Sequence, residues 1–118
     1  MSLKHMKTLI VLVLGLIAVG CGNIAKKKVI GEYEYVDAQT LKEVFLDNGV
    51  SETYRNGKKA SESKWSIVDG EIHAKSDSGA INIWRKNTDK SITSIARIRD
   101  GKRTDFPKEE QNTLKKIK

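Results

Sequence analysis

The chain has little cysteine, histidine or proline. Its 118 residues include one cysteine, two histidines and one proline. A single cysteine excludes a disulfide framework within one molecule. One cysteine and two histidines are also fewer than the roughly four such ligands of a usual structural zinc site. The length leaves room for one domain and excludes a multidomain enzyme.

The longest apolar run of the chain is short, and it lies near the N-terminus. Leu9 to Val19 are 11 residues, and Lys4 and Lys7 precede them. As a helix this run would be about 17 Å long, whereas the hydrocarbon core of a bilayer is about 30 Å thick. Basic residues before an apolar run of this length are typical of a secretory signal peptide. We therefore predict a signal peptide, with a signal helix, over residues 1–20.

The apolar run ends in Ala18-Val19-Gly20-Cys21, which resembles the lipobox of bacterial lipoproteins. That pattern is usually Leu, a small or branched residue, Gly or Ala, and then Cys, so Ala18 departs from it. The resemblance implies that the Cys21 thiol receives a diacylglycerol and that a peptidase cuts before it. Two or more acyl chains would anchor Cys21 in a membrane of the cell envelope, whereas one chain binds only marginally. Gly22 in place of an Asp favours the outer membrane, where the organism has one.

Other interpretations of this segment remain open. Cys21 could be a free thiol buried in the fold, as many free cysteines are. An ordinary signal peptidase could instead release a secreted protein. An uncleaved helix that extends through Ile24 and Ala25 could anchor the protein in the membrane.

The residues after Cys21 are basic. Removal of residues 1–20 takes two lysines from a chain of net charge +7, so that 98 residues with a net charge of +5 remain. We expect residues 21–28 to be a solvated spacer between lipid and fold, with Lys26-Lys27-Lys28 attracted to anionic headgroups. The chain has no long basic stripe of the kind that binds nucleic acid, so no nucleic-acid partner is expected.

From residue 29 onward, turn signals recur about every ten residues. Asn-Gly and Asp-Gly accept the positive φ angles that type I′ hairpin turns need. The signals are Asn48-Gly49, Asn56-Gly57, Asp69-Gly70, Ser78-Gly79, Asn87-Thr88-Asp89-Lys90 and Asp100-Gly101. Between them lie segments rich in branched and aromatic residues, which predict strands at 29–36, 41–47, 50–55, 63–68, 71–75, 80–86, 91–99 and 102–105.

The strands alternate apolar and polar side chains, which is typical of a sheet with one buried face. Consecutive hairpins form a meander, and the outer edges of a meander must be paired or protected. We therefore predict an all-β domain over residues 29–118, an antiparallel meander of seven or eight short strands curled into a small barrel or a flattened sandwich. Pro107 and the polar residues after it predict one helical turn. Leu114 and Ile117 would then close the core as a last strand or a short helix.

The order of turns and aromatics resembles the small lipocalin-like domains found on bacterial lipoproteins. The matching residues are Gly31-Glu32-Tyr33, Asp47-Asn48-Gly49, Asn56-Gly57-Lys58, Lys64-Trp65-Ser66-Ile67 and Asp69-Gly70-Glu71-Ile72. Such domains commonly begin a strand with Gly-x-Trp, whereas Ser63 stands in the Gly position here. The resemblance implies a small barrel.

Large aromatic side chains are the candidates for a binding face, although most such residues form core. The candidates are Tyr33, Tyr54, Trp65 and Trp84. Trp84 is the strongest, because it lies opposite Ile81 and Ile83 in the strand alternation. We expect it to point outward, and exposed large aromatics often mark contacts.

The sequence predicts no catalytic, cofactor or metal site. It has no Gly-x-Ser-x-Gly elbow, and His73 lies on a strand beside charged residues without a base or nucleophile as partner. We therefore predict a non-enzymatic binding module for an apolar small molecule, an envelope polymer or a partner protein. The alternatives are a structural or assembly accessory of an envelope complex, and an inhibitor of a secreted hydrolase.

Overall fold

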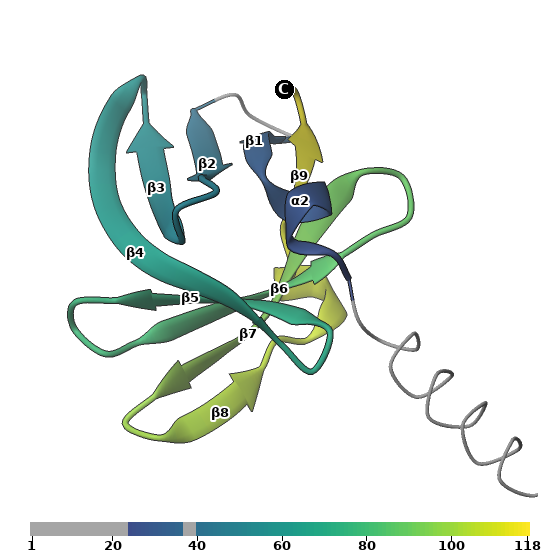
Figure 1. Cartoon of the computed structure of the whole chain (residues 1–118). Coiled ribbons are helices and arrows are strands. Elements are labelled where there is room, and N and C mark those ends of the chain that lie inside the picture. The colour runs from purple at the N-terminus through teal and green to yellow at the C-terminus, as the bar shows by residue number, and fades with distance from the viewer. Residues whose placement is uncertain (1–23, 37–39) are drawn as a thin grey trace, which may run out of the picture.

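A computed structural model of the chain describes residues 24–36 and 40–118. The predicted signal peptide and the lipobox residues Ala18, Val19, Gly20 and Cys21 lie outside the described residues. Within them, a one-turn helix is followed by strands that match the predicted succession (Figure 1). The elements are α2 (Lys26–Val29), β1 (Gly31–Tyr35), β2 (Leu41–Phe45), β3 (Val50–Arg55), β4 (Lys58–Val68), β5 (Glu71–Ser76), β6 (Ile81–Lys86), β7 (Ser91–Arg99), β8 (Lys102–Asp105), the 3₁₀ helix η1 (Lys108–Glu110) and β9 (Thr113–Lys116).

Eight strands close into one antiparallel barrel, which confirms the predicted all-β fold. Each strand from β1 to β7 pairs with the next, and β9 pairs with both β1 and β7. Residues 113–116 are therefore the last strand, and not a helix. The extra strand, β8, pairs with the second half of β7 and lies outside the barrel (Figure 1).

The strand β4 is longer than the predicted segment 63–68. It begins at Lys58, directly after Asn56 and Gly57, whose φ angles of 53° and 80° form a tight turn. The first part of β4, residues 58–62, is exposed and contains no large apolar side chain. For this reason the apolar alternation does not reveal it, and only the preceding turn indicates that the strand starts there.

An aromatic cluster fills the barrel interior near α2. The rings of Tyr33 and Phe45 meet edge to face at a centroid distance of 5.7 Å, and those of Phe45 and Trp65 at 5.5 Å. Edge-to-face pairs of this kind stabilise a core beyond the burial of their area. The other buried members are Val29, Ile72, Ala74, Trp84, Ile92 and Leu114.

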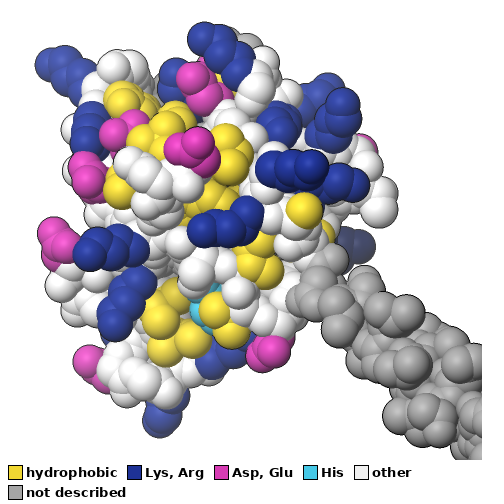
Figure 2. All heavy atoms as spheres, viewed as in Figure 1, with side chains coloured by type: hydrophobic (Ala, Val, Ile, Leu, Met, Phe, Trp, Pro, Cys, Tyr) yellow, Lys and Arg dark blue, Asp and Glu magenta, His cyan; other side chains and the backbone are white. Residues whose placement is uncertain are grey.

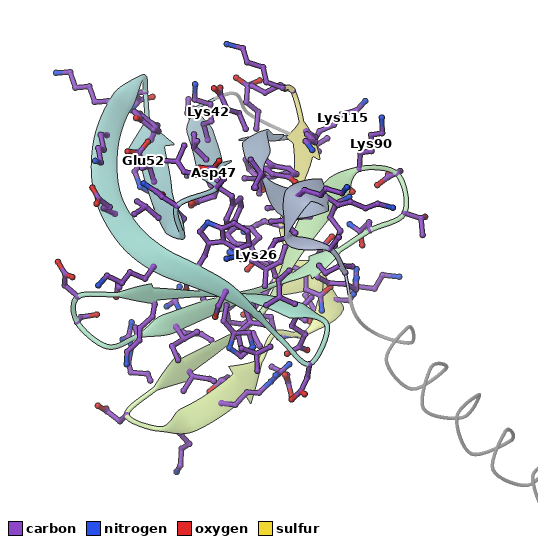
Figure 3. All side chains as sticks on the ribbon, viewed as in Figure 1. Lys26, Lys42, Asp47, Glu52, Lys90 and Lys115 are labelled. Atoms are coloured by element: carbon purple, nitrogen blue, oxygen red, sulfur yellow. The ribbon has the colours of Figure 1, made fainter. Side chains whose placement is uncertain are left out.

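The helix α2 is part of the fold. Val29 is fully buried, and Ile24 and Ile30 pack against the aromatic cluster. The Nζ of Lys26 lies 5.3 Å from the centre of the Trp65 ring, so this lysine points over the core (Figure 3). Within the predicted spacer 21–28, Ile24 packs against the aromatic cluster, whereas residues 25–28 are exposed.

Trp84 lies on the same face of the sheet as its partner Ile72 on β5, and a β-bulge in β7 lies beside it. Ile83 pairs with Ala96, whereas Trp84 pairs with Ser94, so Ile95 is an extra residue in β7. Trp84 is only 7% exposed and belongs to the aromatic cluster. The prediction that Trp84 points outward is therefore wrong. It does lie opposite Ile83, but Ile83 is fully buried as well, so both faces of β6 are covered.

The outer face of β6 is covered by the hairpin of β7 and β8. From β8, Arg103 donates two hydrogen bonds to the carboxylate of Glu71 on β5, at 2.9 and 3.0 Å. This ion pair crosses the sheet face that carries Ile83 and Ala96. The side chains of Ile83 and Ala96 are buried and pair across β6 and β7, so they form a small apolar cluster on the outer face of the barrel.

Candidate functional site

The end of the barrel opposite α2 holds a polar recess of about 210 Å³. Near α2, Gly31 at the start of β1 pairs with Phe45 at the end of β2, and the recess lies toward the other end of β2. Five strands from different sides of the barrel contribute inward-facing residues to it. They are Leu41, Glu43, Thr53, Arg55, Ser61, Asn82, Trp84, Ser94 and Arg97.

Glu43 is the buried ionisable group of the recess. Its residue is 8% exposed, and the hydroxyl of Thr53 on the neighbouring strand lies 2.7 Å from its Oε2 and 3.0 Å from its Oε1. Burial raises the pKa of Glu43 to about 7, although the hydrogen bond from Thr53 and the charge of Arg55 act in the opposite direction. A carboxylate only accepts hydrogen bonds, whereas a carboxylic acid also donates one. Glu43 can therefore change its role near neutral pH.

Two arginines make the opening of the recess cationic. Arg55 and Arg97 are both exposed, on β3 and β7. The Nε of Arg97 donates a 3.1 Å hydrogen bond to Oδ1 of Asn82, and its guanidinium carbon lies 5.9 Å from the ring centre of Phe106. These contacts hold Arg97 beside the recess, so donors surround the opening while Glu43 and Trp84 lie deeper.

The recess is chemically suited to a small polar group. Hydroxyls of Thr53, Ser61 and Ser94 can donate and accept, the amide of Asn82 does both, and the guanidiniums donate only. The indole of Trp84 adds an apolar surface. A few precisely placed polar groups around an apolar contact are typical of small-ligand sites.

The four candidate aromatics do not share one exposed face. Tyr33 and Trp65 are buried in the aromatic cluster, and Trp84 is the one candidate that also lines the polar recess. Tyr54 is half-buried, and its hydroxyl donates a 3.0 Å hydrogen bond to Glu52. The four aromatics therefore do not form one binding face, and of the four only Trp84 lines the polar recess.

The central residue of the recess, Glu43, is not among the candidates from the sequence. A signal for it exists, however, because Glu43 stands in phase with Leu41 and Phe45 on a strand. Side chains two residues apart point to the same face, so a carboxylate between two large apolar residues is a candidate inward-facing acid. The position of Arg97 depends on the bulge in β7, because the bulge lets Ser94 and Arg97, three residues apart, face the same side, which the alternation does not reveal.

Among the residues that the structure describes, no three or more His, Cys, Asp or Glu side chains gather so as to hold a metal ion. In the same described ranges, no helix has the length and apolar character needed to cross a bilayer. Comparisons of the chain with protein-family models, curated proteins and solved structures give no match. The likeness to bacterial lipoproteins and lipocalin-like domains therefore stays a prediction from the sequence.

Proposed function

We propose that this protein is a bacterial lipoprotein, anchored in a membrane of the cell envelope through acylated Cys21, whose barrel is a non-enzymatic binding module. The anchor is supported by the basic residues and the apolar run before Ala18-Val19-Gly20-Cys21. It is also consistent with the position of the barrel, because Ile24, the first described residue, is packed on it and follows Cys21 after two residues.

The ligand that the polar recess supports best is a hydroxyl-rich group, such as a sugar unit of an envelope polymer. The observation that carries this proposal is the buried Glu43, held by Thr53 at the bottom of an open recess beside the ring of Trp84. Sugar hydroxyls need alternating donors and acceptors, and their apolar ring faces pack on aromatic side chains. An apolar small molecule is supported less, because the aromatic cluster occupies the interior beside α2.

We propose binding and not cleavage of such a sugar. Hydrolysis of a glycosidic bond usually takes two carboxylic groups on either side of the bond. The lining of the recess contains one, Glu43. The cationic opening formed by Arg55 and Arg97 further favours sugars that carry an acidic substituent, because guanidinium groups pair well with carboxylates and phosphates.

The recess is tested by titrating the purified mature protein in detergent micelles with acidic oligosaccharide fragments of the envelope, followed by NMR of the tryptophan indole signals. We expect the Trp84 signal to shift on binding. Asn82→Ala should weaken binding about tenfold, which is the loss of roughly one good hydrogen bond. Arg85→Gln is the matched control, since Arg85 is an exposed residue of the same strand that does not line the recess. Equal weakening by both substitutions would contradict the assignment.

The anchor is tested separately by mass spectrometry of the mature N-terminus. We expect Cys21 to be the first residue and to carry a diacylglycerol. An unmodified Cys21, or cleavage at another position, would disprove the anchor and leave the recess to be judged on its own titration.

A further inference from the structure

A second hollow lies at the end of the barrel near α2, and lysines line it. Its volume is about 530 Å³, and its other lining residues are Thr88 and Ile117. The lysines come from α2, β6, the turn between β6 and β7, β9 and the residues after it. We name them the lysine collar: Lys28, Lys86, Lys90, Lys116 and Lys118. Figure 2 shows basic side chains gathered over the region of α2 and β9, and Figure 3 shows that Lys90 points to this side.

The positive charges of the lysine collar have no ion-pair partner among the residues that the structure describes. Of the six ion pairs found in the described residues, none includes a collar lysine. The Nζ of Lys116 instead lies 3.5 Å from the main-chain oxygen of Lys28. The side-chain carboxylate beside the collar, that of Asp89, accepts hydrogen bonds from the amide and the hydroxyl of Ser91.

Lys86 lies close enough to three other lysines of the collar to be repelled by them. The pKa of Lys86 is lowered first by burial and next by the charge of Lys116, with smaller effects in the same direction from Lys28 and Lys90. The charge of Asp89 acts in the opposite direction but does not cancel the shift. A bound anion would relieve this repulsion, so the collar is a surface that favours negative charge.

The link between Cys21 and the barrel is very short. Because Ile24 is packed against the aromatic cluster, only Gly22 and Asn23 lie between it and Cys21. Three residue steps span at most about 11 Å. Electrostatic attraction at physiological salt acts over about 8 Å. An acyl chain on Cys21 would therefore keep the end of the barrel that carries α2 at the headgroups, however the link is arranged.

We propose that the lysine collar docks on the anionic headgroups of the membrane in which Cys21 is anchored. The inference rests on the anchor of the proposed function. It adds that the barrel stands on the membrane in one orientation. The polar recess lies at the opposite end of the strands, so it faces away from the lipid and toward soluble or polymeric ligands.

The orientation is tested with the mature lipid-modified protein reconstituted into two kinds of vesicle, phosphatidylcholine alone and phosphatidylcholine with about one third phosphatidylglycerol. A water-soluble amine-acylating reagent labels exposed lysines, and mass spectrometry of peptides gives the rate for each one. We expect collar lysines to label at least about threefold more slowly on the anionic vesicles, and 0.5 M salt to remove the difference. Lys58 and Lys102, which do not belong to the collar, should label equally on both. Equal rates for the collar lysines on both vesicles would overturn the proposal.

Two charge-matched triple variants make the test specific. Lys28, Lys90 and Lys118 are exposed, so changing all three to Gln should leave the fold intact while Lys86 and Lys116 lose their protection. The control changes Lys58, Lys75 and Lys102, also exposed, to Gln and should keep the protection. Loss of protection in both variants would indicate a general effect of net charge and would overturn the assignment to the collar.

Two further arms separate the possible failures. Inorganic phosphate without vesicles, at matched ionic strength, should leave the labelling unchanged; equal protection by phosphate would show a site for free anions and overturn docking on a membrane. The intact mass of the same preparation reports the lipid on Cys21. If the lipid is missing, the proposed anchor fails, and sedimentation of that protein with the anionic vesicles decides about the collar alone. Salt-sensitive sedimentation would support the collar, and no sedimentation would overturn it.

Discussion

The hydroxyl of Tyr33 donates a 2.7 Å hydrogen bond to the main-chain oxygen of Val29, and both residues are fully buried. The bond joins the last residue of α2 to the middle of β1. Burial raises the pKa of Tyr33 to about 12, so the hydroxyl keeps its proton and remains a donor at physiological pH. This contact, together with the packing of Val29, holds α2 on the end of the barrel.

Tyr33→Phe should therefore lower the free energy of unfolding by about 1 to 2 kcal/mol, since it leaves a buried carbonyl without its donor. Urea unfolding followed by tryptophan fluorescence measures this loss. Tyr35→Phe is the control, because the hydroxyl of Tyr35 bonds to Asn112 in an exposed setting. We expect a smaller loss for the control, and an equal loss in both variants would contradict a special role for the bond to Val29.

Glu43→Gln should change how stability depends on pH. The pKa of Glu43 is raised from 4.5 to about 7 in the folded state. Between these values the folded protein holds a proton that the unfolded chain has released, so stability falls as pH rises through this window. The neutral amide avoids that loss and should be more stable than Glu43 at pH 8 by about 3 kcal/mol. The two proteins should converge near pH 4.

Urea unfolding of both proteins at pH 4, 6 and 8 checks this prediction. The exposed Glu109, in η1, provides the control, and Glu109→Gln should leave the pH dependence as it is. A parent protein whose stability is flat from pH 5 to pH 8 would show that Glu43 is better solvated than its position in the recess indicates.

Gly31→Ala should be strongly destabilising. Gly31 has a φ of 148°, and an added Cβ would lie 2.5 Å from the main-chain oxygen of Lys118 and 2.7 Å from Cε of Lys116. We expect a loss of about 2 to 3 kcal/mol from strain and displacement, measured as a lower thermal midpoint. Gly79→Ala, at a φ of 91° with no atom within 4 Å of the added Cβ, should cost about 1 kcal/mol. Equal costs would mean that the chain after β9 moves aside freely.

Trp84→Ala should destabilise the barrel by about 3 to 5 kcal/mol, because it removes a large side chain from the aromatic cluster. A surface contact residue would behave differently, since its truncation changes stability by less than about 0.5 kcal/mol. Val36, which is 58% exposed, supplies that comparison through Val36→Ala. Unfolding of Trp84→Ala within experimental error of the parent would restore the outward orientation expected from the sequence.

The turns made most of the fold predictable. Asn56, Asp69 and Asp100 each have a positive φ and stand before a glycine, as the predicted hairpins require. Turn chemistry is local, so a sequence shows it directly. Closure of the barrel by β9 depends on pairing with β1 and β7, which lie far away in the sequence, and for this reason the barrel and the sandwich could not be separated beforehand.

The candidate site was less predictable, because it depends on the two faces of each strand. The alternation places Trp84 and Ile83 on opposite faces, and the structure agrees. The prediction that one face of β6 is exposed to solvent was wrong, because β8 covers the outer face of this strand. No local sequence pattern shows that cover. Glu43 was open to prediction from its phase with Leu41 and Phe45, but a charged residue is usually assigned to the solvated face.

The pairing of β9 with both β1 and β7 has a consequence for the order of folding. Tyr35 on β1 meets Leu114 on β9, and Leu114 in turn meets Ile92 on β7. Until residues 113–116 pair with both strands, β1 and the start of β7 are unpaired edges, and such edges readily join the wrong strand. We therefore expect the folding chain to pass through an open sheet with two exposed edges, and the pairing of β9 to form late because it joins distant parts of the chain.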